Sequence, residues 1–138
     1  MSFVLDCSAV LPWVFGDEAT GETDQLLDEL AAGEQALVPG IWHLEVGNVL
    51  LGAMRKKRID QAGVETFFSR LGDLEILVDA ETADRAWDKT LDLAQQHRLS
   101  AYDAAYLELA MRHGVPLATL DKELAAACRT TGVKRKLR

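Results

Sequence analysis

The sequence predicts an α/β fold in which a small parallel sheet is covered by helices on both faces. Short apolar runs alternate with helical patterns of apolar residues along the whole chain, and this alternation is typical of parallel strands joined by helices. The 138 residues contain no linker, repeat or low-complexity segment. Hydrophobic residues make up 49% of the chain, which is enough for one ordinary core. We therefore expect residues 1–138 to form a single domain.

The first part of the chain predicts a strand followed by two helices. The strand covers Phe3–Leu5 and is ended by Asp6. Ser8 can cap a brief helix over residues 8–15. Leucines then recur at helical spacing between residues 23 and 30, which indicates an amphipathic helix that Gly33 is placed to end.

The middle of the chain predicts a second strand and two more helices. The strand covers Ala36–Val38, and Pro39 stops it. A long helix follows from about Ile41 to Lys57, with cations in its last turn, as the helix macrodipole favours. Asp60 can cap the next helix, whose apolar face comprises Val64, Phe67, Phe68 and Leu71.

A third strand is predicted at Glu75–Val78, and we expect Asp79 at its end to serve only as a helix cap. The helix that follows should bury one face, formed by Ala83, Ala86, Trp87, Thr90, Leu91 and Ala94.

The last part of the chain repeats the alternation. Ser100 can cap a helix over about 102–113, and a fourth strand is predicted at 116–120. Asp121 opens the final helix, Gly132 closes it, and Val133 can begin one more short strand.

The charge of the chain excludes some functions. With 22 acidic against 15 basic residues, the net charge is −7, which argues against a protein that coats nucleic acid through a global positive field. Eight of the 15 basic residues lie in two runs, and a solvated helix end and a chain tail explain these runs as well as RNA contact does. The run with candidate RNA contacts comprises Arg55, Lys56, Lys57 and Arg58.

The N-terminus and the cysteines indicate a cytoplasmic protein. The first residues lack the basic segment of a signal peptide, and no apolar run approaches the length of a membrane span. Cys7 and Cys128 match no metal-binding or disulfide pattern, so we expect two reduced, packed thiols.

Four acids lie where predicted strands end or predicted helices begin. Asp6 ends the first strand and Asp121 follows the fourth, while Glu45 and Asp103 fall in the first turns of two helices. In an open α/β sheet, ligands bind beyond the carboxyl ends of the strands. Capping a helix would explain Asp6 and Asp121 taken singly.

Capping does not explain Glu45 and Asp103, which lie among apolar neighbours on their helices. A buried lone carboxylate is costly unless a metal, a cation or a donor compensates it. The stripe that Glu45 shares consists of Ile41, Leu44, Asn48, Val49 and Gly52. We therefore predict that the four acids together hold one or two divalent cations.

Magnesium or manganese suits such a site. Several carboxylates in one pocket repel one another, and hard divalent cations with a preference for oxygen ligands remove that repulsion. Such cations also activate water and stabilise charge in phosphodiester displacement. Zinc is not favoured, because His43, His97 and His113 have no ligand spacing.

Four motifs in order carry a resemblance to a known family. They are residues 6–10 (DCSAV), 45–50 (EVGNVL), 100–110 (SAYDAAYLELA) and 117–121 (LATLD). Over nearly its whole length the chain resembles PIN-domain ribonucleases, specifically the VapC-type toxins of type II toxin–antitoxin systems. One departure is Cys7, where small residues such as alanine or serine are commoner; it leaves the acids untouched.

The resemblance implies a PIN-like fold with about five parallel strands between helices. It also implies an Mg²⁺- or Mn²⁺-dependent endoribonuclease that hydrolyses RNA with metal-activated water. The implied partners are an antitoxin (VapB-like) whose C-terminal segment occupies the acidic groove, and a second copy in a homodimer. The implied catalytic and metal-binding residues are Asp6, Glu45, Asp103 and Asp121, supported by Ser8, Asn48 and Thr119.

Two alternatives remain open from the residues alone. An aspartate-based phosphatase or a phospho-accepting receiver domain also places an aspartate after the first strand. The phosphatase pattern requires a second aspartate where this chain has Ser8, and Lys122 only imitates the receiver lysine. A non-catalytic interaction module, in which the acids merely cap helices, would gain no stability from Mn²⁺.

Overall fold

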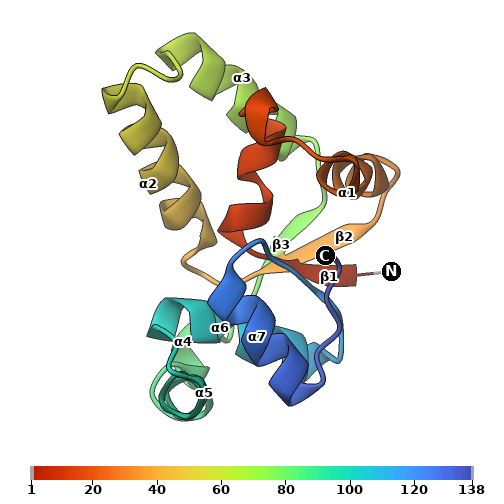
Figure 1. The fold of residues 1–138 in the computed structure, drawn as a ribbon, viewed down its shortest axis with the longest axis vertical. Coiled ribbons are helices and arrows are strands. Elements are labelled where there is room, and N and C mark those ends of the chain that lie inside the picture. Colours follow the sequence, from red (N-terminus) through yellow and green to blue (C-terminus); the bar gives the residue numbers. More distant parts are fainter. Residues whose placement is uncertain (1, 138) are drawn as a thin grey trace.

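The computed structural model describes residues 2–137 and has a parallel sheet at its centre (Figure 1). The strands are β1 (Ser2–Leu5), β2 (Gln35–Val38), β3 (Ile76–Val78) and β4 (Leu117–Ala118). They pair in parallel in the order β3-β2-β1-β4. The central strand β1 is flanked on both sides, so its three apolar residues are almost completely buried. The predicted parallel α/β class is confirmed.

Helices form two layers around the sheet. One side carries α1 (Gly21–Ala31), α2 (Trp42–Arg55) and α3 (Gln61–Gly72), together with three short 3₁₀ helices: η1 (Cys7–Ala9), η2 (Leu11–Trp13) and η3 (Gly16–Glu18). The other side carries α4 (Thr82–Arg85), α5 (Lys89–His97), α6 (Ala101–His113) and α7 (Lys122–Thr131) (Figure 1).

Helix α6 is the main support of the sheet. It contacts β1, β2 and β4, and every residue from 104 to 110 is buried. Ser100 caps its N-terminus by accepting from the backbone N–H of Asp103 at 3.0 Å, and Gly114 ends it in the left-handed conformation (φ 64°). The buried middle of α6 cannot shift easily, and it anchors the first turn, in which Ala101 and Tyr102 are exposed.

The described residues form four strands rather than about five. At the fifth position the chain makes only an isolated parallel bridge between Leu117 and Arg135. The backbone N–H of Leu117 donates to the Lys134 carbonyl, and the N–H of Lys136 donates to the Leu117 carbonyl, both at 2.9 Å. The predicted strand near Val133 is thus reduced to one bridge, and β4 covers only Leu117–Ala118 of the predicted 116–120.

Two predicted helices are broken. Residues 8–15 form two 3₁₀ helices in place of one α-helix, with Pro12 at the start of the second. The helix after β3 is interrupted because Asp88 leaves the helical backbone region (φ −117°, ψ −92°). This interruption leaves Trp87 92% exposed, although the periodicity predicted it to be buried.

Three further expectations on burial are wrong, since Phe68 is 45% and Leu91 is 43% exposed and Ala83 is exposed as well. Within residues 2–137, each helix is too short or too polar to cross a membrane.

Candidate active site

The four predicted acids lie at the same edge of the sheet. Asp6 follows β1, Asp121 follows β4, and Glu45 lies in the first turn of α2, which follows β2. Helix α6 leads back to the start of β4, so its first turn with Asp103 lies at the carboxyl edge as well. Ligands of open α/β sheets bind at this edge.

Asp6 is the most deeply buried of these acids, with 5% of its surface exposed. Its Oδ2 accepts hydrogen bonds from Ser8 Oγ (2.5 Å) and Thr119 Oγ1 (2.7 Å). Its side chain makes no capping bond to η1. The capping interpretation of Asp6 is therefore wrong, and its carboxylate faces the edge of the sheet with two hydroxyl donors.

The two hydroxyls also tie the turn after β1 to the turn after β4. Ser8 Oγ accepts from the backbone N–H of Leu120 at 2.9 Å, and Thr119 Oγ1 accepts from that of Asp121 at 3.0 Å. Each hydroxyl thus accepts a backbone bond while it donates to Asp6. This arrangement brings the predicted supporting residues Ser8 and Thr119 into direct contact with Asp6.

Asp121 does cap a helix, as its position suggested. Its Oδ2 accepts from the backbone N–H of Leu124 at 2.8 Å at the start of α7. Within residues 2–137, Oδ1 receives no such bond. One oxygen of Asp121 therefore caps α7, and the other is free of protein donors among the described residues.

Glu45 is half-buried, but its surroundings differ from those predicted. The buried face of α2 is formed by Trp42, Val46, Leu50 and Ala53. Leu44, in the stripe expected to be buried, is 78% exposed, so Glu45 lies at the margin of the core. Its partner is the buried Tyr106 of α6, whose hydroxyl donates a hydrogen bond to Oε1 of Glu45.

Three of the acids, Asp6, Glu45 and Asp103, have raised pKa values. Burial is the largest cause of the raised pKa values of Asp6, Glu45 and Asp103. Repulsion adds to this effect: Asp121 acts on Asp6 and Asp103, and Asp6 acts on Glu45 and Asp103. None of the salt bridges among residues 2–137 involves any of the four acids. The site is thus a partly dehydrated cluster of negative charge without a protein cation.

The thiol of Cys7, next to Asp6, has a raised pKa for the same reasons. Burial, Asp6 and Glu45 together raise the pKa of Cys7 to about 12. Burial also raises the pKa of Cys128 to about 11, and both cysteines are free. Both are therefore inert, protonated thiols at neutral pH, as predicted.

The donor chemistry of the cluster fits a hard divalent cation. Carboxylates and hydroxyls supply only oxygen atoms, which Mg²⁺ and Mn²⁺ prefer. Among residues 2–137, however, no three Asp, Glu, His or Cys side chains lie close enough to hold one ion directly. The geometry therefore fits an ion held by one or two carboxylates that keeps several water ligands, as Mg²⁺ usually does.

Asn48 does not join the acids directly. It is exposed one turn beyond Glu45, and it lines an open hollow together with Ile41, Leu44, Glu45 and Tyr102. This hollow has a volume of about 510 Å³ and shares Glu45 with the acid cluster. Asn48 is thus placed beside the cluster rather than within it.

In the basic run at the end of α2, Arg58 forms ion pairs with acidic side chains, whereas none of the ion pairs among residues 2–137 involves residues 55–57. Arg58 pairs with Asp17 and Glu18, both at 2.8 Å, and its guanidinium lies 3.9 Å from the centre of the Phe15 ring. Residues 55–57 are exposed. They lie ten or more residues beyond Glu45, which corresponds to about 15 Å along a helix.

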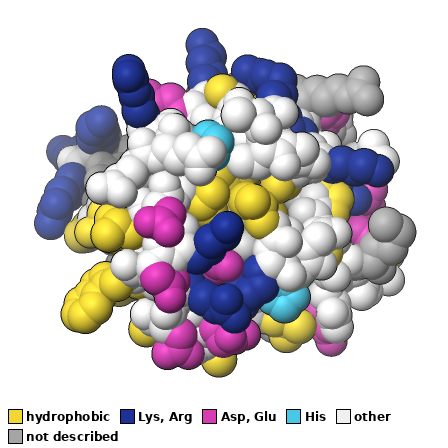
Figure 2. All heavy atoms as spheres, turned by 90° about the horizontal axis from the view of Figure 1, so that it is seen from below, with side chains coloured by type: hydrophobic (Ala, Val, Ile, Leu, Met, Phe, Trp, Pro, Cys, Tyr) yellow, Lys and Arg dark blue, Asp and Glu magenta, His cyan; other side chains and the backbone are white. Residues whose placement is uncertain are grey.

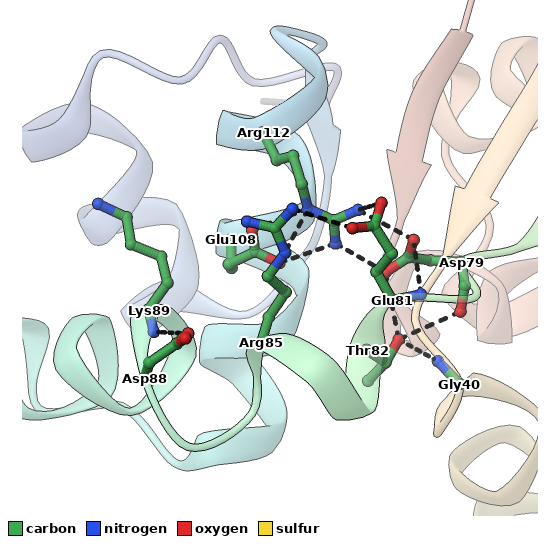
Figure 3. A network of polar contacts seen from close by, with 9 residues as sticks. All are labelled: Gly40, Asp79, Glu81, Thr82, Arg85, Asp88, Lys89, Glu108 and Arg112. Carbon is green, nitrogen blue, oxygen red and sulfur yellow. Dashed lines mark hydrogen bonds and ion pairs between the residues drawn. The ribbon is translucent and has the colours of Figure 1, made fainter.

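Sequence reasoning missed a second polar network, centred on Arg112 (Figure 3). Arg112 pairs with Asp79 at 2.7 Å and with Glu108 at 2.8 Å, and these three side chains are 13%, 8% and 5% exposed. Asp79 was expected only to cap a helix; it is instead the partner of Arg112, which lowers its pKa. The network fixes the end of α6 to the loop after β3.

Figure 2 shows the surface of this side of the molecule. Basic and acidic side chains lie next to one another there, with apolar side chains exposed beside them. This face therefore does not present a continuous positive surface, which agrees with the prediction from the net charge of −7.

Comparison with solved structures supports the fold. The chain is similar to PAE2754 from Pyrobaculum aerophilum, with a TM-score of 0.70 and 23% identity over 99% of this chain and 84% of that chain. It is also similar to VapBC2 from Rickettsia felis bound to a promoter DNA fragment, with a TM-score of 0.62, 18% identity and coverage of 91% and 92%. For a toxin–antitoxin complex from Klebsiella pneumoniae, the TM-score is 0.61 and the identity 20%, with coverage of 99% and 98%.

Comparison with sequence families identifies the chain. No curated protein matches it significantly. The PIN domain model matches residues 3–129, a segment that contains all four acids. The chain belongs to the PIN-domain family.

Proposed function

We propose that this protein is a divalent-cation-dependent endoribonuclease and the toxin of a type II toxin–antitoxin pair. The observation that carries the proposal is the cluster of Asp6, Glu45, Asp103 and Asp121, whose mutual repulsion no protein cation within residues 2–137 relieves. PIN domains are nucleases as a family, and the chain matches the family model from residue 3 to residue 129.

The chain's own residues would prepare the site for Mg²⁺ or Mn²⁺. When bound, the cation would neutralise the acids and supply positive charge for phosphodiester hydrolysis. Ser8 and Thr119 fix the orientation of Asp6 through its Oδ2, and Ser100 holds the first turn of α6 beneath Asp103. Preorganised acids cost little reorganisation when the reaction begins.

The proposed substrate is RNA and the proposed location is the cytoplasm. The exposed residues Arg55, Lys56 and Lys57 are suited to contact the RNA backbone, whereas Arg58 already pairs with Asp17 and Glu18. Asn48 and its hollow adjoin the acids at Glu45, where the nucleotide next to the cleaved phosphate would lie.

The proposed protein partners are a cognate antitoxin and a second copy of the chain. Two of the similar structures are described as VapBC2 and as a toxin–antitoxin complex. An antitoxin segment that carries a cation could occupy the acidic site in place of the metal. We expect expression of the protein alone to arrest growth and co-expression of its antitoxin to restore growth.

Incubation of the purified protein with cellular RNA tests the proposal. We expect new RNA ends at defined positions with Mn²⁺ and none with a chelator. RNA that stays intact in Mn²⁺ would contradict nuclease activity. If Asp6 instead gained a covalent phosphoryl group from a small phosphodonor, the phosphatase or receiver alternative would be favoured.

A further inference from the structure

Tyr106 lies in the middle of α6, and its phenol reaches across to α2. Its side chain is fully buried, and its hydroxyl donates a hydrogen bond to Oε1 of Glu45, which lies 61 positions earlier in the chain. The chain has two tyrosines. The other, Tyr102, lies one turn earlier on α6, is 62% exposed, and its hydroxyl bonds to no residue among 2–137.

The Tyr106 hydroxyl lies where it can bond to a carboxylate of the acid cluster. A buried phenol requires an acceptor, because an unpaired hydroxyl in the core costs free energy. Phenylalanine would fill nearly the same volume without that requirement. The structure offers the hydroxyl a carboxylate of the acid cluster as its acceptor, so the bond joins the core of α6 to the candidate active site.

The bond also gives the two carboxylate oxygens of Glu45 different environments. Oε1 is held by Tyr106, while Oε2 receives no hydrogen bond from residues 2–137. A glutamate has three side-chain torsions, and a half-buried one without a partner would sample several rotamers. Held through one oxygen, Glu45 presents the other in a fixed direction.

We propose that Tyr106 is a positioning residue that orients Glu45 so that Oε2 can bind the divalent cation. This inference rests on the proposed function and deepens it. Tyr106 touches neither the RNA nor the cation, so it acts only through Glu45. Partners that orient metal ligands in this way typically contribute 10- to 100-fold, roughly, to metal affinity or activity.

Binding of Mn²⁺, measured by the electron paramagnetic resonance signal of the free ion, tests the proposal. We expect Tyr106→Phe to weaken Mn²⁺ binding by about 10- to 100-fold. Tyr102→Phe removes the other phenol of α6 and should bind Mn²⁺ as wild type does; it serves as the control for Mn²⁺ binding alone, because Tyr102 lines the hollow proposed for RNA. Tyr106→Phe should also lower kcat for RNA cleavage while it leaves KM for RNA unchanged.

A double-mutant cycle separates positioning from a general structural role. If Tyr106 acts through Glu45, Tyr106→Phe should have no further effect on Mn²⁺ affinity in the Glu45→Ala background. An equal loss in both backgrounds, or wild-type affinity in Tyr106→Phe alone, would overturn the proposal. A wild-type protein that neither binds Mn²⁺ nor cleaves RNA would instead overturn the proposed function.

A spectroscopic measurement decides the question even if Tyr106→Phe does not fold. In the Tyr102→Phe protein, Tyr106 is the single tyrosine, so ¹³Cζ-labelled tyrosine gives one NMR resonance. Addition of Mg²⁺ should shift this resonance, because the cation withdraws charge from the carboxylate that accepts the hydrogen bond. A resonance that does not move while Mg²⁺ protects the protein from thermal unfolding would refute the role of Tyr106.

Discussion

Neutralising Asp6 should stabilise the protein without metal and abolish its response to metal. Asp6 is 5% exposed, and the hydroxyls of Ser8 and Thr119 both donate to its Oδ2. In Asp6→Asn, the amide oxygen has two lone pairs and can accept both bonds. The amide hydrogens would then face acidic neighbours, among them Asp121, which repels the carboxylate in the wild type.

The sign follows from the raised pKa of Asp6, of which burial is the main cause. When a carboxyl group has a raised pKa in the folded state, the protein loses stability as the pH rises from the pKa of the unfolded state, about 3.9, through the pKa of the folded state. Above the folded-state pKa of Asp6 the whole cost is present, and the amide removes it. We expect a gain of about 1 to 2 kcal/mol, as for other favourable single substitutions. This corresponds to roughly 3 to 8 °C in Tm for a domain of this size.

Metal should reverse the order of the two proteins. A cation present at a hundred times its Kd stabilises the wild type by about 2.7 kcal/mol, and Asp6→Asn should gain far less. In thermal unfolding, Asp6→Asn should therefore have the higher Tm in chelator, and wild type should have the higher Tm in Mn²⁺. A variant that is less stable than wild type in chelator, or one that gains as much from Mn²⁺, would refute the reasoning about Asp6.

The remaining predictions concern the two sides of the molecule. Arg112→Met should lower the free energy of unfolding in urea by about 3 kcal/mol, because it leaves the buried carboxylates of its network without their cation. Because Arg112 lowers the pKa of Asp79, the stability difference between wild type and Asp79→Asn should be full above about pH 4 and shrink as the pH falls further; a difference independent of pH would contradict this ion pair. Replacing residues 55–57 together by Gln should raise KM for RNA and flatten its salt dependence, since phosphate contacts release counterions. Arg58→Gln should change KM less, because acids of η3 already pair with Arg58; equal effects would place Arg58 on the RNA.

The sequence predicted the sheet and the four acids because both depend on local patterns. Short apolar runs indicate buried strands. In a parallel sheet with helical crossovers, the ends of all strands meet at one edge. Asp6 after β1 and Asp103 in the first turn of α6 therefore reach the same edge once the topology is known.

What could not be predicted depends on contacts between residues far apart in the chain. Tyr106 and Glu45 are 61 positions apart, and Arg112 and Asp79 are 33 apart. The sequence pattern places Tyr106 on a buried face but does not identify the acceptor of its hydroxyl. It places Asp79 before a helix, where a cap is the common local explanation.

The errors on burial have a similar origin. Periodicity predicts an apolar face only while the helix continues without interruption. Asp88 interrupts the helix after β3, and Trp87 therefore lies on the surface. On α2, the spacing of Leu44 assigns it to the predicted apolar stripe, but its side chain is exposed. The charged form of Glu45 is disfavoured because the residue is half-buried and lies near other acids, not because it belongs to that stripe.

Cleavage of RNA by wild type, Asp103→Asn and Asp92→Asn tests the central claim most directly. Asp103 belongs to the acid cluster, whereas Asp92 lies exposed on α5 and serves as the matched control. We expect Mn²⁺-dependent cleavage by wild type and by Asp92→Asn. Asp103→Asn should cleave at least about 100-fold more slowly, because loss of a ligand to the cation removes several kcal/mol of charge stabilisation. Equal cleavage by all three proteins, or cleavage that persists in chelator, would contradict a catalytic metal site formed by these acids.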